Sequence, residues 1–225
     1  MAERGLTEVD FGVGARVCFT GRDFDLATPG GRKRLADEVG LPLAFANQVH
    51  GVQLRWIGQV AAEPAEYPAC DALATRASGI GLVIRTADCV PVVLADTDRT
   101  VVAAAHVGWR GLLGGILGAV LRDLRDSGVG ELRAAVGPAI CGRCYQIGDD
   151  LAERARAQGQ VVARGRDGSA RLDLSASVAR QLRAGGVEAI WLAPQCTAES
   201  ADFYSWRGQR ATGRQGMVIA LPASP

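Results

Sequence analysis

Three short runs of apolar and β-branched residues follow one another in the middle of the chain and limit the folds available to it. The runs occupy residues 81–86, 90–95 and 101–106. Turn residues separate them, so each run predicts a strand, with a hairpin turn at residues 96–99. A glycine-flanked turn at residues 108–111 comes next and opens a predicted helix. The apolar stripe of that helix comprises Leu112, Leu113, Ile116, Leu117, Val120, Leu121 and Leu124.

The remaining periodic segments are distributed unevenly around this centre. Further strands are predicted at residues 13–19, 43–49, 52–58, 71–75, 132–136, 189–193 and 216–221. Further helices are predicted at residues 30–39, 148–158 and 174–184. Residues 63–68 contain two prolines and predict a loop. The polar and aromatic residues 196–214 predict a long loop that serves a site. The uneven order favours an α+β fold with more than one sheet layer.

Length and charge exclude several classes of protein. The chain has 225 residues without an internal repeat or a low-complexity linker, so we expect one domain over residues 1–225. Its formal net charge is +1 with both signs interspersed, which argues against a nucleic-acid partner. No apolar run is long enough to span a bilayer, and the first residues lack a signal-peptide pattern. We therefore expect a cytoplasmic protein without a membrane partner.

Six cysteines are present, but a chain of this length and apolar content does not need disulfides to fold. Cys18 and Cys70 stand among small or apolar residues and predict buried, inert thiols. Cys141 and Cys144 form a C-x-x-C pair, for which a structural zinc site and a redox role are both conceivable. The chain offers no second pair of this kind, so we interpret residues 141–144 as an unpaired turn with two thiols.

Only two histidines occur, His50 and His106, and each stands beside a glycine turn at the end of a predicted strand. Cys89 also lies where a strand meets a turn, so the three side chains could converge on one pocket. Two imidazoles and a thiolate suit Zn²⁺, and three protein ligands leave a fourth position open for water or substrate. The alternative is that the two histidines and the thiol never meet, because no short ligand spacing connects them.

Several segments together resemble one known family. They read QVHG at residues 48–51, TADCVPVVLAD at 86–96, AAHVGWRG at 104–111 and GPAI with a following C, Y and IG at 137–148. Shorter motifs accompany them: DALAT at residues 71–75, LDL at 172–174, CT at 196–197 and FYSWR at 203–207. Together these segments resemble the laccase-domain family of the YfiH type, also labelled multicopper polyphenol oxidoreductases. The resemblance spans roughly residues 43–221. It implies an α/β/β/α sandwich of mixed sheets flanked by helices, with zinc ligands at His50, Cys89 and His106.

The resemblance also implies an activity. Members of the family are described as purine nucleoside phosphorylases that also cleave methylthioadenosine and deaminate adenosine, whereas an older label makes them copper-dependent phenol oxidases. A multicopper oxidase needs on the order of ten histidines, and this chain has two. A single copper ion at the three ligands stays possible, because Cu²⁺ outcompetes Zn²⁺ at such donors. We expect purine nucleosides and phosphate as substrates and zinc as the cofactor.

Phosphorolysis requires a bound phosphate and stabilisation of the departing purine. Gly108 and Gly111 flank the start of the predicted helix, whose backbone N–H groups, with the guanidinium of Arg110, could hold an anion. The glycines could instead serve tight packing, with Arg110 a surface charge. Arg207 is a second candidate for anion binding. Tyr204 or Trp206 could stack on a base, and the alternative for all three residues is a local cluster that covers the core.

Deamination would use a metal-bound hydroxide and a carboxylate that carries protons. Asp71 and Asp88 are the candidate carboxylates, although Asp88 adjoins Cys89 and could orient a ligand instead. Gln48 precedes His50 by two residues and could read a base or a ribose hydroxyl, or end a strand.

Three competing interpretations stay open at this point. One is a copper-dependent phenol oxidase. A second is a metal-free hydrolase or amidase with Cys89 as the nucleophile and His106 as its base. The third is a metal-binding interaction module, which is disfavoured because an open three-ligand site is a poor structural site.

Overall fold

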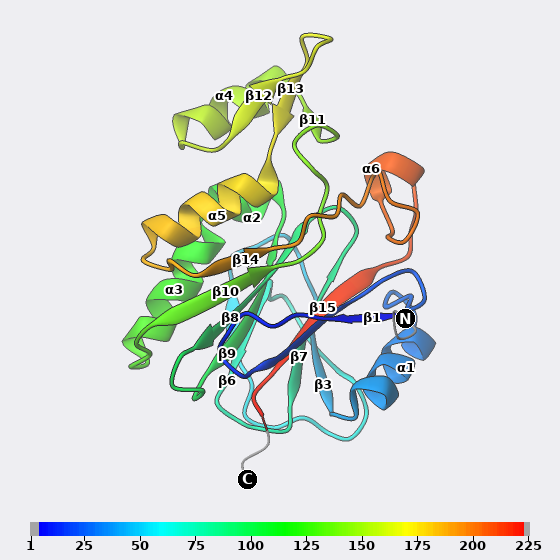
Figure 1. Cartoon of the computed structure of the whole chain (residues 1–225), viewed down its shortest axis with the longest axis vertical. Helices are drawn as coiled ribbons and strands as arrows, with labels where there is room; N and C mark the ends of the chain where they lie inside the picture. Colours follow the sequence, from blue (N-terminus) through cyan, green and yellow to red (C-terminus); the bar gives the residue numbers. More distant parts are fainter. Residues whose placement is uncertain (1–4, 223–225) are drawn as a thin grey trace.

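The computed structural model of the chain describes residues 5–222 (Figure 1). Two six-stranded mixed sheets make up its centre, and a three-stranded sheet lies at the top of the view in Figure 1. Within these residues, the helices are all too short or too polar to cross a membrane.

The first sheet contains both ends of the described chain. Its order is β1 (Leu6–Glu8), β2 (Arg16–Thr20), β15 (Gln215–Ala220), β7 (Gly81–Thr86), β3 (Leu43–Ala46) and β5 (Ala65–Tyr67). Strand β3 pairs in parallel with both β7 and β5, and the other pairs are antiparallel. The carboxyl ends of β3 and β7 therefore lie at the same edge of this sheet.

The second sheet is built around the β8–β9 hairpin. Its order is β14 (Ile190–Leu192), β10 (Leu132–Val136), β8 (Val90–Asp96), β9 (Val102–Val107), β6 (Ala72–Thr75) and β4 (Leu54–Trp56). The predicted turn at residues 96–99 joins β8 to β9, and the Asp96 carboxylate accepts hydrogen bonds from the backbone N–H groups of Thr100 and Val101. The register places the first residues of β8 beside the last residues of β9.

The side-chain alternation of the central strands explains why the sheets stack. On β8, Val90, Val92 and Leu94 face one cluster, whereas Val93 and Ala95 face another. The second cluster also contains Leu82 and Ile84 of β7 and Met217 and Ile219 of β15, so it is the layer between the two sheets. The central strands β8 and β9 are buried on both faces and are accordingly almost entirely apolar.

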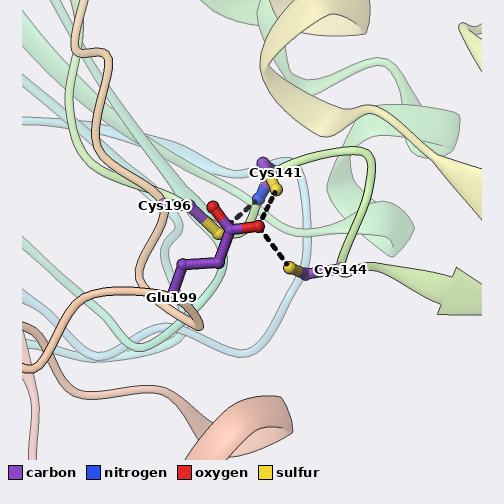
Figure 2. Close-up of side chains that lie close together, drawn as sticks. All are labelled: Cys141, Cys144, Cys196 and Glu199. Atoms are coloured by element: carbon purple, nitrogen blue, oxygen red, sulfur yellow. Dashed lines mark hydrogen bonds between the residues drawn. The ribbon is translucent and has the colours of Figure 1, made fainter.

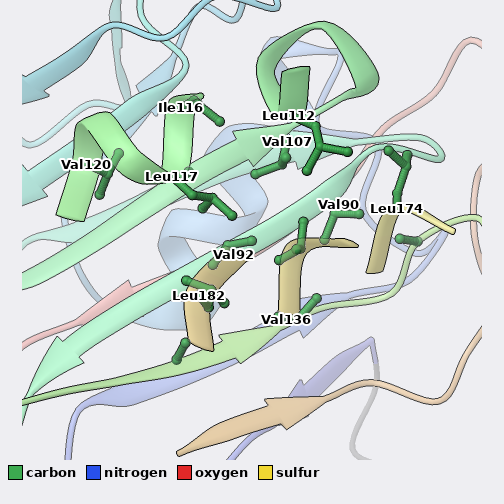
Figure 3. Packing of buried hydrophobic residues seen from close by; sticks show 14 of the residues in the cluster. Val90, Val92, Val107, Leu112, Ile116, Leu117, Val120, Val136, Leu174 and Leu182 are labelled. Carbon is green, nitrogen blue, oxygen red and sulfur yellow. The ribbon is translucent and has the colours of Figure 1, made fainter. Parts of the chain in front are cut away.

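Helices cover the two outer faces. Helix α1 (Pro29–Val39) lies on the first sheet, where Leu35 and Val39 pack with Phe45 and Val83. Helices α2 (Trp109–Gly114), α3 (Ile116–Asp126) and α5 (Leu174–Ala184) cover the second sheet through the cluster drawn in Figure 3. The layer order is α/β/β/α, which confirms the predicted α+β sandwich.

The third sheet is absent from the predicted strands. It contains β11 (Gln146–Ile147), β13 (Ala170–Leu172) and β12 (Val162–Arg164), with α4 (Asp149–Ala157) packed against it. Its strands have two or three residues each, which is too short for a period-2 pattern to be recognised in the sequence. The short helix α6 (Trp206–Gln209) interrupts the predicted loop at residues 196–214.

Two local predictions are wrong. The helix after residue 111 is two helices, because Gly115 adopts a left-handed conformation with a φ of 83° and ends α2 before α3 begins. The loop predicted at residues 63–68 contains β5, a half-exposed edge strand that pairs with β3. Elsewhere the helix at residues 30–39 is confirmed, with Thr28 and Gly40 as its caps, and Cys18 and Cys70 are buried as predicted.

Candidate metal centre

The topology brings the three candidate metal ligands together. His50 lies on the connection from β3 to β4, and Cys89 lies on the connection from β7 to β8. Both connections leave the first sheet at the same edge and enter the second. His106 is the penultimate residue of β9, and the antiparallel register places it opposite Pro91, beside the start of β8. The sandwich therefore gathers residues 50, 89 and 106 at one end of the layer between the sheets.

The ligand atoms of His50, Cys89 and His106 all lie within 4.8 Å of one another. Cys89 Sγ is 3.9 Å from His50 Nε2, and the two imidazole rings have centroids 4.9 Å apart at an interplanar angle of 76°. In a tetrahedral zinc site, neighbouring ligand atoms are roughly 3.4–3.8 Å apart. Two nitrogens and one sulfur at this separation fit Zn²⁺, and His50 is exposed, so a fourth position faces solvent.

Asp71 orients two of the three candidate ligands. Its carboxylate accepts a hydrogen bond from Nδ1 of His106 at 2.8 Å, which turns Nε2 of that ring toward Cys89. The same carboxylate accepts hydrogen bonds from the backbone N–H groups of Val49, His50 and Gly51 at 2.7–3.1 Å. These bonds hold His50 in a left-handed conformation with a φ of 61°, which is unusual for a residue with a side chain.

The charges of these groups depend on one another. Burial raises the pKa of Cys89, but the positive charge of His106 and hydrogen bonds from both histidines outweigh it and bring the pKa to about 6. Burial lowers the pKa of His106, but the Cys89 thiolate and Asp71 outweigh it and raise the pKa to about 9. Burial also raises the pKa of Asp71, whereas hydrogen bonds from His106 and the backbone lower it below its ordinary value. Cys89 is thus a thiolate at neutral pH, the form that binds a metal.

Gly108 leaves the space that these side chains occupy. A Cβ atom at this position would lie 2.9 Å from Cδ2 of His50 and 3.0 Å from Sγ of Cys89. Its φ of −84° is open to any residue, so contact and not backbone conformation requires the glycine. Gly111 also allows a close approach, since a Cβ atom at this position would lie 3.3 Å from the carbonyl oxygen of Gly51. Both glycines therefore lie where α2 packs closely against the His50 connection.

Asp88 belongs to a second buried network beside Cys89. Its φ is 89°, and its carboxylate accepts hydrogen bonds from the hydroxyls of Thr197 and Ser205 at 2.8 and 2.6 Å. The backbone N–H of Arg207 donates a further bond to Asp88 at 2.7 Å. Asp88 therefore anchors residues 197–207 next to the candidate metal centre, and it touches neither histidine through a hydrogen bond of the described residues.

Two adjacent cavities lie at the centre, and both are lined by His50, Cys89 and Arg214. One, of about 340 Å³, also has Gln48, Arg85 and His106 in its wall. The other, of about 430 Å³, has a wall formed by Asp88, Trp109, Arg110, Tyr145, Trp206 and Arg207. We call the two together the cleft. Four arginines face it, and each cavity falls within the size range of sites for small molecules.

The predicted substrate-binding residues lie at different distances from the centre. Arg110 and Arg207 line the cleft, where their guanidinium groups stack over Trp109 and Tyr145 at 4.4 and 4.8 Å. The Gln48 side chain also lines it, but its amide donates to the Arg85 carbonyl and accepts from the Arg85 N–H.

Tyr204 faces away from the centre. Its hydroxyl donates to the carbonyl oxygen of Arg22, and it is not among the described residues that line the cleft.

Sequence reasoning misses two arginines of the cleft, Arg85 and Arg214. Arg85 lies near the end of β7 and pairs with Glu66 at 2.7 Å, on the edge strand within the predicted loop. Arg214 directly precedes β15 and donates to the carbonyl oxygens of Thr212 and Gly213. The signal for Arg214 is the long polar loop itself, while nothing local distinguishes Arg85 from other arginines.

Known proteins resemble this chain over most of its length. Residues 18–222 match the family described as multi-copper polyphenol oxidoreductase laccase. A purine nucleoside phosphorylase of Deinococcus radiodurans is 40% identical over 199 residues, which cover 85% of this chain and 76% of that protein. One of Streptomyces coelicolor is 39% identical over 201 residues, which cover 87% of this chain and 83% of that protein.

Solved structures share the fold over nearly the whole chain. YlmD from Geobacillus stearothermophilus superposes with a TM-score of 0.87 at 26% identity, covering 99% of this chain and 98% of that one. The Bacillus licheniformis protein YfiH superposes with a TM-score of 0.88 at 24% identity, covering 98% and 97% of the two chains. The match over residues 18–222 and the identities of the relatives lead to one conclusion: the chain belongs to the multi-copper polyphenol oxidoreductase laccase family.

Proposed function

We propose that this chain is a zinc-dependent purine nucleoside phosphorylase whose residues 1–225 form one catalytic domain. The observation that carries the proposal is the opening of the His50, Cys89 and His106 cluster into a cleft lined by arginines. Relatives at 40% and 39% identity are named purine nucleoside phosphorylases. The proposed substrates are adenosine, inosine, guanosine and methylthioadenosine, each with inorganic phosphate.

The arginines of the cleft would bind the phosphate that phosphorolysis requires. A phosphate oxygen must attack the anomeric carbon of the sugar while the bond to the purine nitrogen breaks and its electron pair leaves with the base. Arg110, Arg207 and Arg214 line one cavity of the cleft, and their guanidinium groups would bind the phosphate and hold it in line for attack. Tyr145 and Trp109 stack against two of these guanidinium groups, so their positions are set before phosphate binds.

A metal ion at the His50, Cys89 and His106 centre would act on the purine nucleoside, the second reactant. When bound at His50, Cys89 and His106, Zn²⁺ would supply a Lewis acid with one open coordination position. Asp71 holds the His106 ring in the orientation and tautomer that a ligand needs, and it fixes the His50 backbone through the same carboxylate. Cys89, as a thiolate, contributes the negative charge that offsets the metal.

We also propose adenosine deamination as a second activity of the same centre. It requires a group that carries a proton between water and the purine. Asp88 is the carboxylate among the described residues that line the cleft, and its Oδ2 atom accepts a single hydrogen bond, from Arg207 N–H. Asp71, by contrast, is fully buried and its two oxygens accept four hydrogen bonds.

The decisive experiment measures metal content and product release on protein purified without added metal. We expect zinc, together with hypoxanthine release from inosine that depends on phosphate and is lost in the Cys89→Ser variant. An exposed variant on α3, Arg122→Ala, is the matched control and should keep full activity.

Two other results would replace the proposal. Copper in the site with oxidation of phenols, and no phosphate-dependent turnover, would favour an oxidase. The low pKa of Cys89 also suits a nucleophile. Ester or amide hydrolysis that survives chelation and stops when Cys89 is alkylated would therefore favour the metal-free hydrolase.

A further inference from the structure

Four side chains outside the cleft converge on a second point of the molecule. Cys141, Cys144, Cys196 and Glu199 each offer a ligand atom, and these atoms lie within 4.8 Å of one another (Figure 2). The sequence suggests an unpaired turn at residues 141–144, because no second C-x-x-C pair exists. The structure corrects this interpretation by placing Cys196 and Glu199 against that turn.

The two halves of the cluster have the same spacing. Cys141 and Cys144 are separated by two residues, and so are Cys196 and Glu199. Each half is a tight turn, since Cys144 N–H donates to the Cys141 carbonyl at 3.0 Å and Glu199 N–H donates to the Cys196 carbonyl at 3.2 Å. A parallel bridge between Ala139 and Cys196 holds the two turns together. Paired x₂ turns of this kind are how structural zinc sites present four ligands.

Hydrogen bonds already orient the ligand atoms. The backbone N–H of Cys141 donates to Sγ of Cys196 at 3.3 Å and so fixes the position of that sulfur beside the turn at residues 141–144. Sγ of Cys144 and Sγ of Cys141 lie 3.3 and 3.8 Å from Oε1 of Glu199. The guanidinium of Arg143 donates to both carboxylate oxygens of Glu199, at 2.9 and 3.2 Å, and so fixes the direction of that side chain.

We propose that Cys141, Cys144, Cys196 and Glu199 bind a second metal ion, a structural Zn²⁺ held by three thiolates and one carboxylate. Binding releases the three thiol protons to solvent and closes all four tetrahedral positions, so no open position is left for catalysis. Three sulfur donors select a thiophilic ion over Mg²⁺ or Ca²⁺. A disulfide between two of the cysteines would use two of the four converging groups and leave the third thiol and the carboxylate unpaired.

The site would hold one wall of the cleft in place. Ile140 and Tyr145, which line the cleft, lie on the loop that carries the first two cysteines. Ser205 and Arg207, which bond to Asp88, lie on the segment that begins at Cys196. A metal ion at the cluster would thus join the two segments that surround Asp88, although no ligand of this ion faces the substrate.

Metal stoichiometry tests the proposal on the full-length protein, purified with reductant and saturated with zinc before removal of loosely bound ions. We expect two equivalents of zinc per chain in the wild type and one in each of the Cys144→Ser and Cys89→Ser variants. The double variant should retain none, and Cys18→Ala, which removes a buried thiol elsewhere, should retain two.

Cobalt substitution identifies the ligands independently of activity. In the Cys89→Ser background, Co²⁺ should give an intense sulfur-to-metal charge-transfer band, and this band should disappear when Cys144→Ser is added. If Cys144→Ser does not fold, as judged by circular dichroism, Glu199→Gln keeps all three thiols and should weaken metal binding at the cluster at least tenfold.

A single equivalent of zinc in the wild type, with no charge-transfer band in Cys89→Ser, would overturn the proposal. So would a disulfide between any two of Cys141, Cys144 and Cys196 found by mass spectrometry in protein that still binds one equivalent. Both outcomes concern the cluster alone, so they are separable from failure of the first metal centre.

Discussion

Replacing Gly108 with alanine tests whether His50 and Cys89 must keep their positions to bind a metal ion. The new Cβ would lie 2.9 Å from Cδ2 of His50 and 3.0 Å from Sγ of Cys89, whereas ordinary contacts begin near 3.4 Å. One or both candidate ligands must therefore move by about 0.5 Å, while metal–ligand distances tolerate about 0.2 Å. We expect the metal affinity to fall by about 100-fold, which is the upper end of the effect of disturbing a ligand's support.

The stability of the protein reports this loss. At a metal concentration of about 100 times the wild-type Kd, binding stabilises the fold by about 2.7 kcal/mol, and a 100-fold weaker site retains about 0.4 kcal/mol. The difference of about 2.3 kcal/mol corresponds to about 5–9 °C in Tm for a chain of this size. The assay is thermal unfolding with and without zinc. A second zinc site would be present in both proteins, so its contribution cancels in the comparison.

The matched control is Gly118→Ala on the exposed face of α3, where the nearest atom to the new Cβ is 3.6 Å away. This variant should keep the full zinc-dependent rise in Tm and gain up to about 1 kcal/mol from the higher helix propensity of alanine. If Gly108→Ala shows the same zinc-dependent rise as the wild type, His50 and Cys89 do not act as ligands in the geometry described.

Three further predictions concern the same centre. Asp71→Asn should lower the metal affinity about 10- to 100-fold, because the amide cannot accept hydrogen bonds from His106 and from all three backbone N–H groups. Competition with a chelator measures this affinity, and an unchanged value would contradict the orienting role of Asp71. In metal-free protein, alkylation of Cys89 should reach half its maximal rate near pH 6, because the pKa of Cys89 is lowered to about 6 and the reactive thiolate forms above that pH. A midpoint near pH 9 would show that His106 does not stabilise the thiolate. Arg214→Ala should raise the KM for phosphate about 10- to 100-fold, as for a lost charge-assisted hydrogen bond of about 1.5–3 kcal/mol, while Arg122→Ala leaves it unchanged.

Local sequence patterns are sufficient to predict the central strands of the fold. The strands at residues 81–86, 90–95 and 101–106 and the helix at 30–39 are predictable because their apolar residues, caps and turn residues are neighbours in the chain. The same holds for the candidate ligands. The scarcity of histidine and the position of each residue at a strand end make His50, Cys89 and His106 candidates, and the resemblance to the family adds the ligand role.

Tertiary structure decides the contacts between residues that are distant in the chain. The strand β5 exists through its pairing with β3, and the strands of the third sheet are too short to carry a pattern of their own. Asp71 resembles a proton carrier in the sequence, and the fold makes it the hydrogen-bond acceptor of His106, 35 residues away. Cys141 and Cys144 meet their partners Cys196 and Glu199 only through a bridge between two loops.

The physical reason is the range of the interactions involved. Helix caps, turns and side-chain alternation act over a few residues, so a linear sequence displays them directly. Convergence of side chains depends on strand register and on the way two sheets stack, which are properties of the whole packed core. The sequence therefore shows which residues could perform chemistry, and the sandwich determines which of them meet.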